Sequence, residues 1–380
     1  MSDQRDLISE VPDHKKYDDY TSSLLGQYSQ FQNTLRANSA TVMLDRKETT
    51  DSNLNVDRFN ELNIIFRSST FKNREESTSE NTATYRNQKI AVVVPAFNEE
   101  LLIGDALSSI PDFINTIYAV DDCSTDQTMN IIQEYSLIDK RIVPIHHEIN
   151  GGVGKAITSG FKRAIQDNLD IVVVMAGDNQ MDPQYLPNLL DPIIERQCDF
   201  TKGNRLKNGF WKGMSAWRLF GNILLTTLNN IASGYWYIKD PQNGYVAIST
   251  NALKKINLEH LYPRYAFEND LMIKTNIADI KMLNIDIPAK YGNEQSKIKY
   301  LNFIFSTSAF LLKSFIYRIS EKSKQSLNPV YPLYFSSLIL VFAGIPLVVM
   351  NIGVIFALGL ILFASACALE AFQQKRSSKG

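Results

Sequence analysis

The sequence has few cysteines and almost no excess charge. Its three cysteines, Cys123, Cys198 and Cys367, lie far apart and form no CxxC pair. This spacing argues against a disulfide framework or a structural zinc site and favours free thiols in a reducing compartment. Lys and Arg number 39 and Asp and Glu 40, for a net charge of -1 over 380 residues. Because nucleic-acid binders carry a strongly basic surface, we expect no nucleic-acid partner.

Charged residues are absent from one long segment near the C-terminus. Between residues 325 and 369 there is no Asp, Glu, Lys or Arg. An apolar helix needs about 20 residues to cross a hydrocarbon core roughly 30 Å thick, so the segment has room for two spans. We predict a two-span transmembrane hairpin over 331–369, with spans at 331–349 and 352–369. The alternative, a helix pair buried in a soluble core, requires two helices that lack a polar face.

The residues that flank the uncharged segment predict its orientation. Lys322 and Lys324 precede the first span, and a basic tail, residues 370–380, follows the second. Positive charge on both flanks predicts an integral membrane protein with both termini and the domain before the spans in the cytoplasm. Residues 298–324 mix aromatic and basic side chains, which favours amphipathic juxtamembrane helices lying on the lipid bilayer. An ordinary amphipathic helix packed on the neighbouring domain is the alternative.

The first 88 residues lack long apolar runs. Stretches such as NREESTSENTATYRNQK favour solvent over a core. No charged segment leads into an apolar one, so we expect no cleaved signal peptide. Residues 1–88 are therefore predicted to form a polar, mostly disordered extension.

Residues 89–290 alternate between two kinds of segment. Short β-branched runs, KIAVVVPAF, TIYAVDDCSTD, RIVPIHH and DIVVVMAGD, are separated by segments with apolar residues at helical spacing. Strands that alternate with helices predict crossover connections and an α/β fold with a mostly parallel, Rossmann-like sheet. The continuous apolar character of the strands fits burial on both faces of that sheet.

Acids follow three of these predicted strands: Glu99, then Asp121 and Asp122, then Asp178. Open parallel sheets bind ligands at the carboxyl ends of their strands, so these acids are expected to converge. Carboxylates gathered without a cation repel one another, whereas Mg2+ joins one or two carboxylates to a ligand's phosphates. We therefore predict that Asp178 holds Mg2+ or Mn2+ and that the metal holds a diphosphate. Asp182, which precedes a proline, is predicted to be a helix N-cap.

Three patterns fail as signatures of other sites. GGVGK departs from a phosphate loop because Ile149 and Ala156 stand where Gly and Ser or Thr are required. His146 and His147 have no third ligand at a spacing that suits a metal. PAFNEE follows the first strand, where a dinucleotide-dependent oxidoreductase needs GxGxxG.

An ordered set of motifs resembles the family 2 glycosyltransferases of GT-A fold. The motifs are VVVPAFNEE, VDDCSTDQT, INGGVGKAITSGFKRA, MAGDNQMDP, KGNRL, DPQNGYVAIS and YAFENDLMIK. They are most similar to the dolichyl-phosphate mannose synthases and polyprenyl-phosphate hexose synthases. The resemblance covers about 90–290 and extends to the two-span tail. Each motif is weak alone, and their order makes the set specific.

The resemblance implies a donor that is a UDP- or GDP-linked sugar. The residues it implies for nucleotide-sugar binding are Pro95, Asn98, Glu99, Asp121, Asp122 and Lys155. Asp178 would bind the metal on the diphosphate, and Gln180 would lie near the transferred sugar. The family usually has an acid two residues before Asp178, where this sequence has Ala176. That departure removes one oxygen from the metal site.

The resemblance also implies an acceptor, a polyprenyl or dolichyl phosphate at the cytoplasmic face. The acceptor-side residues it implies are Arg205, Arg218, Asp240, Gln242, Glu268 and Asp270. A guanidinium pairs bidentately with phosphate, which suits the two arginines, although either alone could be a surface residue. Any of Asp240, Glu268 and Asp270 could act as a base, and among these three carboxylates we choose Asp240 as the catalytic residue. Since a phosphate monoester has a second pKa of about 6, it needs positioning more than deprotonation.

Other functions stay open on the sequence. One is a transferase of the same fold that acts on a glycan or on a lipid without phosphate. Another is a non-catalytic membrane scaffold, which only Ala176 supports. A processive polysaccharide synthase would carry QxxRW, which is absent. The sequence also leaves a homo-oligomer open.

Overall fold

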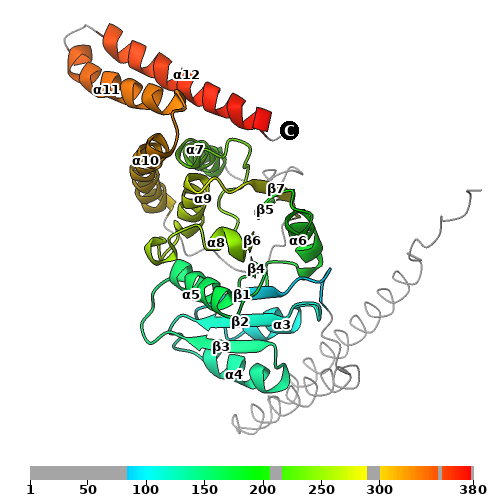
Figure 1. Cartoon of the computed structure of the whole chain (residues 1–380). Helices are drawn as coiled ribbons and strands as arrows, with labels where there is room; N and C mark the ends of the chain where they lie inside the picture. The colour runs from blue at the N-terminus through cyan, green and yellow to red at the C-terminus, as the bar shows by residue number, and fades with distance from the viewer. Residues whose placement is uncertain (1–83, 206–215, 289–299, 350–352, 378–380) are drawn as a thin grey trace, which may run out of the picture. The chain divides into compact units, whose positions relative to one another are not determined.

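A computed structural model of the chain describes residues 84–205, 216–288, 300–349 and 353–377 (Figure 1). All of them belong to the second of two units into which the chain divides, Glu80–Gly380. The predicted polar extension, 1–88, falls almost wholly outside the described residues and stays a prediction.

A seven-stranded sheet forms the centre of this unit. Its strands are β1 (Ile90–Ala96), β2 (Thr116–Asp121), β3 (Ile142–His146), β4 (Ile171–Val174), β5 (Phe200–Asn204), β6 (Val246–Ser249) and β7 (Met282–Asp286). Their order is β3-β2-β1-β4-β6-β5-β7. β6 runs antiparallel to both of its neighbours, and the other pairs are parallel. The predicted mostly parallel α/β fold is confirmed, with one reversed strand that the sequence did not reveal.

Helices cover the sheet and then extend beyond it. They are α3 (Ile103–Ser108), α4 (Thr128–Ile138), α5 (Val153–Gln166), α6 (Leu186–Ile194), α7 (Ala216–Ser233), α8 (Thr250–Leu253), α9 (Phe267–Ile277), α10 (Tyr300–Gln325), α11 (Val330–Val349) and α12 (Val354–Ser377), with 3-10 turns η1 (Pro183–Tyr185) and η2 (Leu258–His260). Figure 1 shows α5 and α4 on opposite sides of the β1–β3 part of the sheet. This arrangement explains why every residue of β1 is buried.

The contact between α5 and β1 requires a residue without a side chain. Gly160 lies over Val93, and a Cβ built at Gly160 would lie 2.5 Å from both methyl groups of that valine. We expect Gly160→Val to destabilise the fold by about 2 kcal/mol, because overpacking forces the helix away from the sheet. Thermal melting in detergent should show a midpoint several degrees lower. Gln166→Val, which places the same residue at an exposed position of α5, is the control, and equal midpoints for the two variants would contradict the prediction.

The strand order creates a switch point between β1 and β4. The chain leaves β1 toward β2 on one side and reaches β4 on the other. Ligands of open α/β sheets bind in the crevice outside the carboxyl ends of such strands. The segments that follow β1, β2 and β4 are those that carry the predicted donor-side residues, so the fold brings them to one edge.

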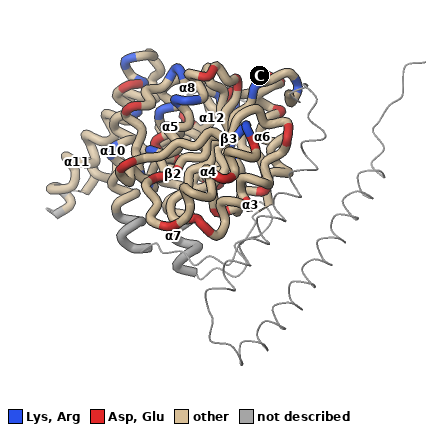
Figure 2. The backbone as a smooth tube through the Cα atoms, turned by 90° about the horizontal axis from the view of Figure 1, so that it is seen from below, with Lys and Arg blue, Asp and Glu red and all other residues tan. Residues whose placement is uncertain are grey.

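The C-terminal helices α11 and α12 form an antiparallel hairpin (Figure 1). Two glycines allow their close approach, since a Cβ at Gly344 would lie 2.6 Å from the backbone of Phe356 and one at Gly359 would lie 2.7 Å from that of Val341. Within the described part of the chain, one helix, Val354–Arg376, has the length and apolar composition needed to cross a membrane. The apolar stretch of α11, Val330–Pro346, is shorter, so the first predicted span stays a prediction. Figure 2 shows α11 without Lys, Arg, Asp or Glu.

The predicted juxtamembrane region appears as a single long helix, α10. Leu312, Lys313 and Tyr317 are exposed on it, as expected for a face that meets lipid. Two basic residues counted toward that face are instead buried. Arg318 is fully buried in an ion pair with an acid of α12, and Lys322 pairs with an acid in the turn after α9. This side of α10 is therefore packed on the rest of the unit, because acids of α12 and of the turn after α9 neutralise its charges. The predicted contact of α10 with lipid stays a prediction.

Candidate active site

The segments after β1 and β2 are clamped together by hydrogen bonds. Asn98, which has a left-handed backbone (φ 55°), accepts from the backbone N–H of Thr125 at 2.8 Å. Its own N–H donates to Ser124 Oγ at 2.9 Å, and the N–H of Glu99 donates to Thr128 Oγ1 at 2.8 Å. Pro95 is buried at the end of β1 beside this clamp. These hydrogen bonds hold the predicted donor-side residues of the two segments close to one another.

Asp122 organises the turn that leads into α5. It is 2% exposed, and its carboxylate accepts from the N–H groups of Gly151 and Gly152 at 2.9 and 2.6 Å. Nδ1 of His147 lies 2.8 Å from the same carboxylate, and Nε2 of that ring lies 2.9 Å from Ser159 Oγ. These contacts engage both oxygens of Asp122 within the protein. Its predicted contact with the nucleotide stays a prediction.

Asp121 is fully buried at the end of β2. Its Oδ2 lies 2.9 Å from Nδ1 of His146, whereas its Oδ1 is buried and, within the described part of the chain, has no hydrogen-bond partner. A buried carboxylate oxygen without a partner is costly. The predicted contact of Asp121 with the nucleotide sugar also stays a prediction.

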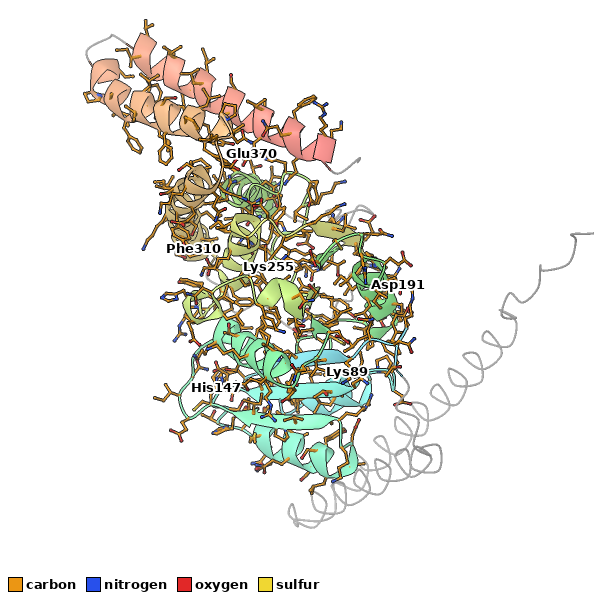
Figure 3. All side chains as sticks on the ribbon, viewed as in Figure 1. Lys89, His147, Asp191, Lys255, Phe310 and Glu370 are labelled. Carbon is orange, nitrogen blue, oxygen red and sulfur yellow. The ribbon has the colours of Figure 1, made fainter. Side chains whose placement is uncertain are left out.

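The sequence favours a strand-end pair for His146 and His147 over a metal site, but it does not identify the partners of the two rings. Each ring contacts an acid at the end of β2 or directly after it. The signal was in the sequence, because Asp121 ends β2 and Asp122 follows it, while His146 ends β3 and His147 follows it. His146 pairs in register with Asp121. Figure 3 shows His147 beside the β1–β3 part of the sheet.

Asp178 lies in the loop that follows β4, at the switch point. β4 ends at Val174, earlier than predicted, and the N–H of Gly177 donates to the carbonyl of Pro95 at 3.2 Å. Asp178 is half-buried, and its Oδ1 accepts from the N–H of Gln180 at 3.0 Å, which closes a tight turn. Gln180 is thereby held next to Asp178, and its predicted place near the transferred sugar stays a prediction. The N-cap role of Asp182 is confirmed, because its Oδ1 accepts from the N–H of Gln184 at 3.0 Å.

The predicted metal site rests on a single carboxylate. The methyl group of Ala176 supplies no oxygen, and Asp178 is the acid that this loop presents at the switch point. Mg2+ and Mn2+ keep several waters and bind through one or two carboxylates together with substrate phosphates. One carboxylate at the edge of the sheet fits that pattern, provided that the donor's diphosphate supplies further oxygens.

On the acceptor side, the structure brings Arg205 and Asp240 together. Nε of Arg205 lies 2.8 Å from Oδ2 of Asp240, and Nη2 lies 3.2 Å from Oδ1, so the pair is bidentate. The side chain of Asp240 is 5% exposed and that of Arg205 is 42% exposed. The predicted phosphate-binding group thus faces solvent while a buried acid fixes its orientation.

Lys202 is a charged residue of this cluster that the sequence analysis did not single out. It lies on β5, is 1% exposed, and donates through Nζ to the carbonyl of Asn243. Burial lowers the pKa of Lys202 to about 8, and the carboxylates of Glu268 and Asp240 oppose that shift. Burial also raises the pKa of Glu268, against the effect of Lys202 and Arg205. The sequence signal that could have pointed to Lys202 is its place as the one charged residue of the strand segment FTKGN.

The start of β6 links the Asp178 loop to the acceptor side. The hydroxyl of Tyr245 donates to the carbonyl of Asp182 at 3.0 Å. A Cβ at Gly244 would lie 3.3 Å from Met181 and 3.5 Å from Oε1 of Glu268, so both segments crowd against this glycine. Gln242, predicted on the acceptor side, lies with its Nε2 3.5 Å from Asn269 Oδ1.

Three other predicted residues stand apart from this arrangement. Asp270 accepts from the N–H of Tyr262 at 2.8 Å and pairs with Lys274, so it holds a turn and is not presented to an acceptor. Lys155 is exposed on α5 beside the Gly151–Gly152 turn. Arg218 falls in the first turn of α7, and its side chain lies outside the described part of the chain.

The segment that holds most of the sheet is similar to known proteins. The family model described as glycosyl transferase family 2 matches residues 91–256. The UDP-N-acetylglucosamine–dolichyl-phosphate N-acetylglucosaminyltransferase of Methanococcus voltae is 31% identical over 216 residues, which cover 53% of this chain and 84% of that protein. The undecaprenyl-phosphate mannosyltransferase of Micrococcus luteus is 26% identical over 201 residues, which cover 49% of this chain and 77% of that protein.

A structural comparison gives a more distant likeness. Glucosyl-3-phosphoglycerate synthase of Mycobacterium tuberculosis, solved with Mn2+, UDP and phosphoglyceric acid, superposes with a TM-score of 0.45 and 20% sequence identity. The match covers 61% of this chain and 79% of that one.

Proposed function

This chain belongs to glycosyl transferase family 2, and on that premise we propose that it transfers a single sugar from a UDP- or GDP-linked donor to a polyprenyl or dolichyl phosphate. The transfer takes place at the cytoplasmic face of the membrane, with α12 as an anchor. The names of the relatives from Methanococcus voltae and Micrococcus luteus support a lipid phosphate as the acceptor. UDP-N-acetylglucosamine is the first donor to test, because the relative at 31% identity is named for it.

One observation carries the proposal: a partly exposed guanidinium, that of Arg205, is held in place by a buried acid. Arg205 is oriented by the bidentate contact with Asp240, and the Asp178 loop is tied to the same region through Tyr245. A guanidinium fork matches two oxygens of a phosphate. The site thus has a carboxylate for the donor's diphosphate on one side and a cation for the acceptor's phosphate on the other.

The proposed reaction needs little acid–base chemistry. Asp178 would hold Mg2+ or Mn2+, which when bound supplies positive charge to the departing diphosphate. Arg205 binds the lipid phosphate, and Asp240 keeps that guanidinium in place. A phosphate oxygen then attacks the anomeric carbon from the side opposite the diphosphate. The new bond forms as the bond to the diphosphate breaks, and the configuration at that carbon inverts.

The experiment uses the full chain purified in detergent with labelled UDP-N-acetylglucosamine, UDP-glucose or GDP-mannose. Undecaprenyl phosphate and dolichyl phosphate serve as acceptors, and the matching alcohols without phosphate serve as controls. We expect one donor to place label in the organic-extractable lipid, with the phosphate lipids alone. Label on the alcohols, or on a water-soluble glycan, would replace the proposed acceptor. Failure of UDP and GDP to bind would favour the non-catalytic scaffold.

A further inference from the structure

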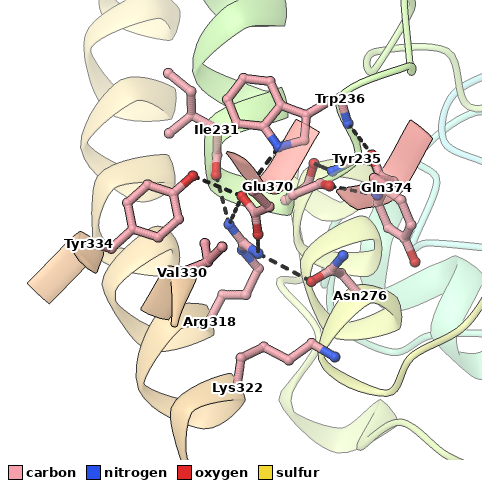
Figure 4. Close-up of polar contacts among 12 residues, drawn as sticks. Ile231, Tyr235, Trp236, Asn276, Arg318, Lys322, Val330, Tyr334, Glu370 and Gln374 are labelled. Atoms are coloured by element: carbon pink, nitrogen blue, oxygen red, sulfur yellow. Dashed lines mark hydrogen bonds and ion pairs between the residues drawn. The ribbon is translucent and has the colours of Figure 1, made fainter. Parts of the chain in front are cut away.

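A buried ion pair joins the membrane-anchor helix to the catalytic domain. Arg318 of α10 is 0% exposed, and its Nη1 lies 2.6 Å from Oε1 of Glu370 on α12. Its Nη2 lies 3.3 Å from Oε2. The same carboxylate accepts from the hydroxyl of Tyr334 on α11 at 2.9 Å and from Nε1 of Trp236 at 3.2 Å (Figure 4). Donors from two helices and from the segment after α7 therefore converge on Glu370.

Arg318 also binds the end of α7 directly. Its Nε donates to the carbonyl of Ala232 at 2.8 Å, and Nη2 donates to that of Ile231 at 3.1 Å. These carbonyls belong to the last turn of α7, where the helix dipole favours a cation. Nη1 lies 3.4 Å from Asn276 Oδ1 at the end of α9. The guanidinium thus fixes the ends of two helices of the catalytic domain.

The turn that follows α7 is held from α12 at two further points. Gln374 donates to the carbonyl of Gly234 at 2.7 Å and accepts from the N–H of Trp236 at 2.8 Å. Gly234 has a φ of +73°, and a Cβ there would collide with the guanidinium of Arg318. This turn, residues 234–236, is therefore shaped around side chains from α10 and α12.

Hydrogen bonds hold the segment between this turn and the acceptor-side motif in place. The hydroxyls of Tyr235 and Tyr237 donate to the carbonyls of Ile280 and Met282, each at 2.6 Å. Asp240, which orients Arg205, follows four residues after Trp236. The position of Asp240 is consequently linked through a short, pinned segment to residues of the anchor helix.

Stability alone does not explain why such a cluster is charged. Well-packed apolar residues commonly replace a buried ion pair at no cost in stability, because both charges must be desolvated. The hydrogen bonds of the charged cluster are directional, unlike apolar contacts, and those that reach the backbone fix the position of a backbone group. Here those backbone groups belong to the end of α7 and to the turn before Asp240.

We propose that Arg318, Glu370 and Gln374 are positioning residues for the transfer reaction. They fix the position of the turn 234–236 relative to α12. In this way they also fix the position in which the Arg205–Asp240 pair binds the lipid phosphate. The anchor helix is in this way part of the acceptor site's framework as well as a tether. The inference rests on the proposed function for its effect on catalysis, and on the contacts alone for its effect on the turn.

The kinetic test uses the double variant Arg318→Met/Glu370→Met in the full chain. Two methionines fill the space without leaving a buried charge, so the variant should stay folded, with a melting temperature lowered by the donors and carbonyls that lose their partners. Misplacing reacting groups by about 1 Å can cost on the order of 100-fold, so we expect kcat for lipid glycosylation to fall at least about tenfold while KM for the donor is unchanged. The matched control is Glu321→Met/Lys324→Met, which removes a partly exposed pair from α10 and should leave both kcat and KM unchanged.

Hydrogen exchange tests the contact independently of the acceptor. Backbone amides of residues 234–240 should exchange faster in Arg318→Met/Glu370→Met, while those of β1 and α5 should not change. If the unmodified protein glycosylates no phosphate lipid, the proposed function fails, and the exchange result still decides whether α12 holds the turn. Unchanged exchange, with or without a fall in kcat, would overturn the inference. Faster exchange with full kcat would overturn its catalytic part.

Discussion

Replacing Asp178 with Asn is expected to lower the rate of sugar transfer about a hundred- to a thousandfold and to leave the fold intact. The amide keeps an oxygen for the hydrogen bond from the N–H of Gln180, so the turn after β4 should survive. What is lost is the negative charge that would hold Mg2+ or Mn2+ against the donor's diphosphate. Removing one group that stabilises charge in the transition state typically costs about that much in kcat. Because Ala176 supplies no second carboxylate in this loop, no neighbour there can take over.

The measurement is the transfer rate over a titration of Mg2+ or Mn2+, with nucleotide diphosphate binding determined in parallel. Asp182→Asn is the matched control, because it makes the same change in the same loop at a residue that caps a helical turn. Asn is an effective N-cap, so this variant should keep close to full activity. Activity should also disappear on treatment with a chelator. Equal activity in the two Asn variants would remove Asp178 from the metal site.

Replacing Arg205 with Lys is expected to weaken use of the lipid phosphate by about 30- to 100-fold in kcat/KM. Lysine keeps the positive charge opposite Asp240, which is 4% exposed and would be costly to leave without a partner. It cannot reproduce the two parallel hydrogen bonds that a guanidinium makes. Loss of one such charge-assisted hydrogen bond costs about 2 to 3 kcal/mol, which corresponds to the stated range.

Kinetics with varied lipid and with varied donor separate this effect from a general loss of activity. In Arg205→Lys, KM for the lipid phosphate should rise while KM for the nucleotide sugar stays constant. Arg163→Lys is the control, since it changes a surface arginine that pairs with Asp167 one turn away on α5. If both variants behave like the unmodified protein, Arg205 does not bind the acceptor's phosphate. If instead the donor's KM rises, Arg205 serves the donor side.

The donor half of the candidate site could be anticipated because its residues follow strands directly. Glu99, Asp121 and Asp178 end apolar runs, and parallel strands bring such ends to one edge whatever the details of packing. The difference between the surroundings of Asp121 and Asp122 could not be anticipated in this way. It depends on the turn before α5 and on β3, which together engage both oxygens of Asp122 and leave Oδ1 of Asp121 without a partner within the described part of the chain.

The acceptor half depended on contacts between distant segments. Arg205 and Asp240 are separated by α7, and the sequence offered no reason to pair them. Lys202 was overlooked because a single lysine in a short strand reads as an exposed edge residue, whereas β6 and β7 flank β5 on both sides and bury it. The antiparallel insertion of β6 between β4 and β5 is itself a long-range choice that no local pattern reports.

The sequence by itself determined the alternation of strands and helices, the acids at the strand ends, the N-cap at Asp182 and the uncharged C-terminal segment. Each of these features follows from interactions between residues a few positions apart, or from the transfer of a segment between water and an apolar phase. The residues of a short segment are therefore enough to predict it. The tertiary structure alone decided the place of β6, the pairing of Asp121 with His146, and the burial of Arg318 against Glu370. The position of β6 depends on which distant strands pair with it. The two charge pairs depend on which distant segment supplies the partner, because a charged side chain is buried at a tolerable cost only where it is paired.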